Sequence, residues 1–220
     1  ARDGDVQKAL FLLRNGAEVN AKSAIGWTPL HIAVLFKKTQ LTRLLLEHGA
    51  DVNGGTCEHD FSADSIDEPD KQEDWAQSNL PDDDWQIVSL PINYARLKDM
   101  AAVLIEFGAD AAGRDLFGRT ALIAISASTV LGPDHNACEC GELAELLVIH
   151  GADVCARDEE GHTPLHFCCC LGMLSVLVAH GADVNARNVY GRNPLYEVRT
   201  AELAEALIVH GADVNARTEY

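Results

Sequence analysis

Cysteine and histidine side chains are the residues of this sequence that could bind a metal ion. His135, Cys138 and Cys140 lie close together, and Cys57 and His59 form an earlier pair. Thiolate and imidazole ligands of this kind suit zinc. However, His-x2-Cys-x-Cys is not a usual spacing for structural zinc, and a fourth ligand would have to come from far away in the chain. We therefore predict free thiols here, with no metal and no cofactor.

Three adjacent cysteines, Cys168, Cys169 and Cys170, offer a second group of thiols. In the repeat pattern described below they fall within a first helix, where small residues usually pack, so we predict that they belong to the core. The chain has seven cysteines in total. An odd number with three in a row is a poor framework for disulfides, which favours the reducing cytoplasm or nucleus as the location.

The sequence holds no motif that is typical of catalysis. A glycine-rich phosphate loop, a nucleophile elbow and a His-Glu-x-x-His zinc motif are all missing from the 220 residues. Carboxylates are plentiful, but no motif forces two of them into one site. We therefore predict that the chain has no catalytic residues and is not an enzyme.

The charge of the chain restricts its partners. Asp and Glu number 34 against 17 Lys and Arg, for a formal net charge of -17. Such a surface disfavours nucleic acid, whose binding depends on Lys and Arg, and it favours basic proteins or peptides. No apolar run approaches the roughly 20 residues of a membrane span. We expect a protein or peptide partner and no direct insertion into a membrane.

A repeated tripeptide, Gly-Ala followed by an acidic residue, reveals how the chain is organised. It starts at Gly16, Gly49, Gly108, Gly151, Gly181 and Gly211, at intervals of 33, 59, 43, 30 and 30 residues. A second marker, Thr28-Pro29-Leu30-His31, begins 12 residues after the first glycine of its interval. Related segments begin at Thr120, Thr163 and Asn193, and a weaker version begins at Leu90.

Both markers have a physical explanation. Thr or Asn before Pro is typical of an N-cap followed by the first residue of a helix. Glycine after a histidine, as at His48-Gly49, fits a helix end that turns through a left-handed conformation. Between the markers, Leu41, Leu44 and Leu45 recur at helical spacing. Each unit is therefore two helices and an extended turn, and the units must stack to bury their apolar faces.

These motifs resemble the ankyrin-repeat family over nearly the whole chain. The resemblance implies an all-α solenoid of stacked helix-turn-helix units with hairpin-like turns and two loop insertions. We expect one domain over residues 1–220, with about six units of which the first is truncated. Both ends fall inside the pattern, so we expect the native protein to continue.

The chain departs from the family pattern in its turns. The units that begin near Leu90, Thr163 and Asn193 are three residues short, which predicts a first helix or following turn shortened by nearly one turn. Lys37 stands where the family usually has glycine. The geometry of that turn is therefore in question.

Two insertions interrupt the repeats, at residues 54–86 and 126–141. The first holds eleven acidic residues and one basic residue, Lys71, together with Trp75 and Trp85. One interpretation is a solvated loop. The other is an acidic and aromatic element that contacts a basic partner or folds back onto the solenoid.

The resemblance also implies a partner-binding surface, formed by the hairpin tips and the exposed side of the first helices. Apolar and aromatic side chains at these positions indicate a binding patch; the alternative is packing between adjacent hairpins. The corresponding residues here are Ala24, Ile25, Trp27, Leu35, Phe36, Leu116, Phe117, Arg119, Glu159, Glu160, His162, Val189, Tyr190 and Arg192.

We accordingly predict a protein-protein interaction module or adaptor. One alternative is the substrate-receptor part of a ubiquitin ligase, which would need a ligase-docking box that these residues lack. Others are a cytosolic ankyrin segment of a channel or membrane-associated protein, and an accessory solenoid of an enzyme.

Asn20, Asn53, Asn185 and Asn215 occupy equivalent turn positions, each after an acidic residue and Val and eight residues after a Leu. This context resembles that accepted by the asparaginyl hydroxylase that modifies ankyrin repeats, so these are candidate hydroxylation sites. The competing interpretation is that Asn bonds its own turn. Ala112 and Cys155 replace Asn in the other two units.

Overall fold

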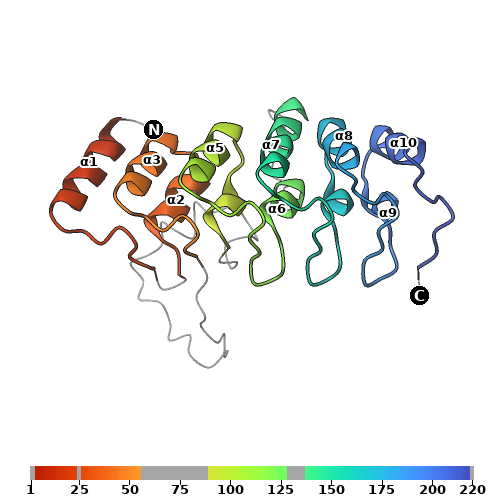
Figure 1. Ribbon diagram of the computed structural model, residues 1–220, viewed down its shortest axis with the longest axis horizontal. Coiled ribbons are helices and arrows are strands. Elements are labelled where there is room, and N and C mark those ends of the chain that lie inside the picture. The colour runs from red at the N-terminus through yellow and green to blue at the C-terminus, as the bar shows by residue number, and fades with distance from the viewer. Residues whose placement is uncertain (1–2, 24–25, 56–88, 128–136, 219–220) are drawn as a thin grey trace, which may run out of the picture.

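The helices of this protein form two parallel rows that run the length of the molecule, as the ribbon shows (Figure 1). The computed structural model describes residues 3–23, 26–55, 89–127 and 137–218. Within these ranges the only pairing of strand type is a single antiparallel bridge between Arg114 and Thr120. The predicted all-α solenoid is confirmed.

The longer helices form one row and the shorter helices form the other (Figure 1). The long row holds α1 (Asp3–Arg14), α3 (Thr39–Glu47), α5 (Lys98–Glu106), α7 (Ala137–Ile149), α8 (Leu171–Ala179) and α10 (Ala201–Val209). The short row holds α2 (Pro29–Leu35), η1 (Pro91–Tyr94), α6 (Ala121–Ala127), η2 (Pro164–Phe167) and α9 (Pro194–Glu197). None of the helices in these described ranges has both the length and the apolar character needed to cross a membrane.

The short row differs in helix length as the repeat intervals predict. Helices α2 and α6 have seven residues, whereas η1, η2 and α9 have four. After η2, Cys168 adopts a ψ of 123°, so the chain leaves the helical turn directly in an extended direction. Cys168, Cys169 and Cys170 therefore link η2 to α8 and do not lie on a first helix, which corrects the sequence-based placement.

The core lies between the two rows and continues from one repeat to the next. Each repeat from α2 onward contributes one or more large side chains that are almost completely buried: Leu30, Ile92, Met100, Leu104, Leu122, Ile123, Leu147, Leu165, Met173, Leu174, Leu177 and Leu207. Because a single helix pair cannot bury this apolar surface alone, each repeat depends on its neighbours for stability.

The Thr-Pro-Leu-His motif both begins a helix and ties it to the next repeat. The Nδ1 atom of His31 accepts from the Thr28 backbone N–H at 3.2 Å and lies 2.8 Å from the Thr28 hydroxyl. Its Nε2 therefore carries the proton and donates to the Ser89 carbonyl at 2.9 Å. Burial lowers the pKa of His31 below its ordinary value of 6.5, and this keeps the ring neutral.

Candidate protein-binding surface

The turn around Phe117 exposes two apolar side chains in a fixed geometry. The buried Asp115 carboxylate accepts from the backbone N–H groups of Phe117 and Arg119, both at 2.9 Å. This turn leaves the Leu116 and Phe117 side chains 50% and 45% exposed. The Arg119 guanidinium lies 5.5 Å from the centre of the Phe117 ring and pairs with Asp115. The tip thus presents apolar surface to solvent without being loose.

A turn two repeats later has the same construction. The buried Asn188 side chain accepts from the backbone N–H groups of Tyr190 and Arg192, both at 3.0 Å. Val189 and Tyr190 are consequently 56% and 40% exposed. The Arg192 guanidinium lies 5.7 Å from the centre of the Tyr190 ring.

The tip between these two is acidic. Asp158 accepts from the His162 backbone N–H at 2.7 Å, which again shapes the turn. Glu159 and Glu160 are both exposed. We use the name tip surface for the six exposed residues of these three turns, which are Leu116, Phe117, Glu159, Glu160, Val189 and Tyr190.

Backbone hydrogen bonds join the three tips into one row. The Glu159 N–H donates to the Phe117 carbonyl at 3.0 Å, and the Val189 N–H donates to the Glu160 carbonyl at 2.9 Å. Loops tied in this way keep their relative positions, which reduces the entropy lost when a partner binds.

An arginine at the start of each tip strengthens the same row. Arg114 donates to the Arg157 carbonyl at 2.6 Å, Arg157 to the Arg187 carbonyl at 2.7 Å, and Arg187 to the Arg217 carbonyl at 2.9 Å. The sequence analysis missed this series. Its signal is an Arg two residues after each equivalent turn position, which is Ala112, Cys155 or Asn185.

Several predicted contact residues lie where the sequence placed them. The tip-surface residues are exposed, Arg192 is exposed and Arg119 is partly exposed. Phe36 directly follows α2 and is 40% exposed, whereas Leu35 is half-buried. Ala24, Ile25, Trp75 and Trp85 lie outside the described residues, as does most of the acidic insertion.

Trp27 requires a correction, because it is only 4% exposed and cannot belong to an open patch. Its ring lies 5.4 Å from that of Tyr94 on η1 and 6.1 Å from that of His31, measured between ring centres. Trp27 therefore joins two repeats.

His162 requires the same correction, since it occupies the same repeat position and is 7% exposed. Its ring packs against those of His166 and Phe167, at 5.4 and 5.0 Å between ring centres. Its Nδ1 atom also lies 3.4 Å from carboxylate oxygens of both Asp158 and Glu160. This side chain shapes the acidic tip from within.

The turn asparagines form bonds between repeats. The Asn53 side chain donates to the Gly108 carbonyl at 3.0 Å and accepts from the Asp110 N–H at 2.8 Å. Asn20 bridges to Gly49 and Asp51, and Asn185 bridges to Gly211 and Asp213, in the same way. The interpretation in which Asn bonds only its own turn is wrong for these three residues.

The two units without asparagine lack this bridge. Ala112 has no side-chain polar group, and the Cys155 thiol reaches the Gly181 carbonyl only at 3.7 Å. Hydroxylation of Asn20, Asn53, Asn185 and Asn215 stays a prediction, and it would require the enzyme to reach amides that are engaged with a neighbouring repeat in at least three cases.

The fold brings together cysteines that the sequence analysis did not group. Cys168 and Cys170 are buried as predicted, but Cys169 is exposed. Cys140, one of the residues considered for zinc from its spacing, lies beside Cys169 and Cys170. Cys57, His59 and His135 lie outside the described residues, and the side chain of Cys138 does too.

Comparison with known proteins agrees with the architecture. The family model for ankyrin repeats (3 copies) matches residues 1–63 and 135–218. Human Ankyrin repeat and SOCS box protein 6 is 32% identical over 163 residues, which cover 73% of this chain and 32% of that protein. Human Ankyrin repeat and SOCS box protein 16 is 31% identical over 173 residues, which cover 70% of this chain and 36% of that protein.

A shorter match concerns a different class of protein. Human Mitochondrial disaggregase is 41% identical over 63 residues, which cover 29% of this chain and 8% of that protein. The chain spans about a third of the length of the two SOCS box proteins that it matches. With its repeated turns, its two rows of helices and these matches, the chain belongs to the ankyrin-repeat family.

Proposed function

We propose that this chain is an adaptor that holds a partner protein through the tip surface. Ankyrin repeats are protein-protein interaction modules and are typically not enzymes. The observation that carries the proposal is the fixed row of tips, in which Leu116 and Phe117 at one end and Val189 and Tyr190 at the other expose apolar surface. Exposed apolar patches of this kind mark interaction sites.

The chemistry of the tips suggests what the partner looks like. Glu159 and Glu160 separate the two apolar tips. A complementary partner segment would carry apolar side chains at two places with basic residues between them. The net charge of -17 favours the same kind of partner over nucleic acid.

Two double variants test this surface. Leu116→Ala with Phe117→Ala, and Val189→Ala with Tyr190→Ala, each remove the apolar part of one tip. Partners purified with the wild-type chain are compared with those of each variant by quantitative mass spectrometry, and affinity is then measured with the purified partner. We expect each double variant to weaken binding by about 1–4 kcal/mol because buried apolar anchors dominate such interfaces.

A matched control removes an exposed apolar residue elsewhere. Val209 ends α10 in the long row and is 82% exposed, so Val209→Ala changes apolar surface away from the tips. Binding should be unchanged in this variant, and all variants should melt at the wild-type temperature. A partner that binds both tip variants as tightly as the wild type would refute the proposed surface.

A second candidate function is the substrate receptor of a ubiquitin ligase. It is favoured by the two relatives that are named for a SOCS box. The test is whether the protein binds a ligase scaffold while these repeats bind the substrate. If the repeats bind no substrate of the ligase, this second candidate is excluded and only the adaptor function remains. We also propose a location in the cytoplasm or nucleus, which the odd number of cysteines supports.

A further inference from the structure

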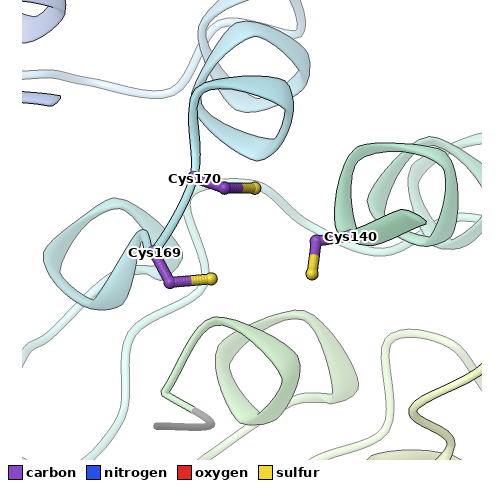
Figure 2. A group of neighbouring side chains, drawn as sticks. All are labelled: Cys140, Cys169 and Cys170. Atoms are coloured by element: carbon purple, nitrogen blue, oxygen red, sulfur yellow. The ribbon is translucent and has the colours of Figure 1, made fainter. Parts of the chain in front are cut away.

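Three cysteine sulfurs converge at the junction of two repeats. The Sγ atoms of Cys140, Cys169 and Cys170 all lie within 4.8 Å of one another. Figure 2 shows Cys169 and Cys170 directed from the segment before α8 toward Cys140, which belongs to α7. Two elements that are separate in the sequence therefore supply one cluster of thiols.

The repeat register explains why these residues meet. Cys140 and Cys170 are 30 residues apart, which is the interval between Gly151 and Gly181. They therefore hold equivalent positions in consecutive repeats, and stacking places equivalent positions side by side. Cys169, next to Cys170, supplies the third sulfur.

A close contact between two glycines fixes the distance between the two elements. A Cβ atom built at Gly141 would lie 3.0 Å from the backbone carbon of Gly172 and 3.1 Å from its oxygen. These glycines adjoin the cluster, one directly after Cys140 and the other two residues after Cys170. A side chain at residue 141 would require the Gly172 backbone to give way by a few tenths of an ångström, which would shift α7 away from α8 and move the sulfurs.

The cluster also provides a place for negative charge. Cys170 caps the first turn of α8, where its sulfur accepts from the Met173 N–H at 3.4 Å. An N–H donor at this position stabilises negative charge on the sulfur. A helix N-terminus stabilises a thiolate in the same way.

We propose that Cys140, Cys169 and Cys170 bind one zinc ion as thiolates. Zinc-thiolate bonds of about 2.3 Å place neighbouring sulfurs about 3.8 Å apart in a tetrahedral site, so a small inward movement from the observed spacing is sufficient. Cys169 is exposed, so water can reach the cluster and take the fourth coordination position. Thiolates are soft ligands that select zinc over calcium or magnesium.

The neighbouring Cys168 does not take part. Its side chain is buried, and its thiol is directed to the Cys170 carbonyl oxygen at 3.3 Å. Cys168 thus remains a core residue outside the site, whereas the three cluster cysteines would release their protons to water when the metal binds. The zinc site differs from the one considered from sequence, with which it shares only Cys140.

The test uses the reduced, metal-free full chain and two metal ions as probes. Co²⁺ should give the ultraviolet absorption of thiolate-to-cobalt charge transfer, with one ion bound per chain, and Zn²⁺ should remove this absorption by displacing it. Zn²⁺ should also raise the melting temperature because it binds the folded chain preferentially. Cys169→Ser is the main variant, since this exposed residue can change without disturbing the core, and it should weaken metal binding by about 100-fold or more.

Two further variants separate the cluster from thiols in general. Cys155→Ser removes an exposed thiol in a turn and should leave metal affinity unchanged. Gly141→Ala retains all the sulfurs and should weaken binding by separating α7 from α8. The proposal is overturned if Co²⁺ gives no charge-transfer band with the folded wild type, if Cys169→Ser binds Zn²⁺ as tightly as the wild type, or if the protein as isolated contains a disulfide between cluster cysteines and takes up no metal after reduction.

Discussion

The repeats that begin at Gly26 and at Gly161 start with nearly the same sequence and then diverge. In both, a single residue separates the glycine from the Thr-Pro-Leu-His tetrapeptide. In both, the histidine Nδ1 atom accepts from the Thr N–H, at 3.2 Å for His31 and 3.0 Å for His166. Both Nε2 atoms reach a carbonyl of the next repeat, that of Ser89 or of Arg192.

The two repeats differ in the segment after the histidine. The first continues into the seven-residue helix α2 and turns at Lys37, whose φ is 55°, whereas the second stops after the four residues of η2. The tetrapeptide thus fixes how a helix begins and how it joins its neighbour. The number of residues before the second helix decides how far the first helix extends.

The largest expected difference concerns the residue before the tetrapeptide. Trp27→Ala should lower the free energy of unfolding by about 3–5 kcal/mol, because it leaves a cavity beside Tyr94. His162→Ala should cost less, since a smaller ring is removed. Chemical denaturation of both variants measures the difference, and an equal cost would mean that the two positions are equivalent after all.

Removal of the histidine itself should be costly in both repeats. His31→Ala and His166→Ala each leave a buried Thr N–H and a carbonyl without their partner, for an expected loss of about 2–4 kcal/mol in the free energy of unfolding. The loss should be larger for His31, which also packs against Trp27 and Tyr94. His48→Ala, at the exposed end of α3, is the control and should change stability little.

Acid should weaken both repeats through the same histidines. Burial lowers the pKa of His31 and of His166 below the ordinary value of 6.5. The unfolded chain therefore binds more protons than the folded chain just below pH 6.5, so stability is complete above this pH and falls as the pH drops through it. Denaturant midpoints at pH 7.5 and 5.5 measure the effect.

A matched variant assigns the acid sensitivity. His31→Gln should be less stable at pH 7.5 but should lose less on acidification than the wild type. Stability that stays level or rises between pH 7.5 and 5.5 would contradict the neutral state of these rings.

The smallest expected effect on stability concerns the turn at Lys37, which the repeat that begins at Gly26 has and the repeat that begins at Gly161 lacks. A left-handed φ disfavours residues other than glycine by roughly 1 kcal/mol, so Lys37→Gly should stabilise the chain by up to about that amount. Lys37→Ala keeps the unfavourable conformation and should give no gain. If both variants change the melting temperature equally, the Lys37 side chain and not its backbone is responsible.

The sequence was sufficient for the architecture because the markers of helix start and end are local. Thr28 and Gly49, for example, act through bonds to residues within a few positions. The 30-residue intervals also predicted the shortened helices η2 and α9. Local rules were enough wherever a residue contacts its own repeat.

Contacts between repeats were harder to predict. Trp27 was assigned to solvent because position in the repeat does not reveal whether the next repeat offers an aromatic neighbour such as Tyr94. The burial of His162 was missed because its ring packs against His166 and Phe167 of its own repeat. The cysteine cluster was missed because Cys140 was compared only with residues of the two insertions. Its partner Cys170 lies one full repeat away, and only the register relates them.

The asparagine bridges give the array an uneven mechanical character. Asn20 and Asn53 tie together the repeats at one end, and Asn185 ties those at the other. Ala112 and Cys155 leave the middle without an amide bridge. Arg114 and Arg157 bridge these two junctions instead. We therefore expect bending, and the first opening under a pulling force, to occur near α7 once those arginine bonds are broken.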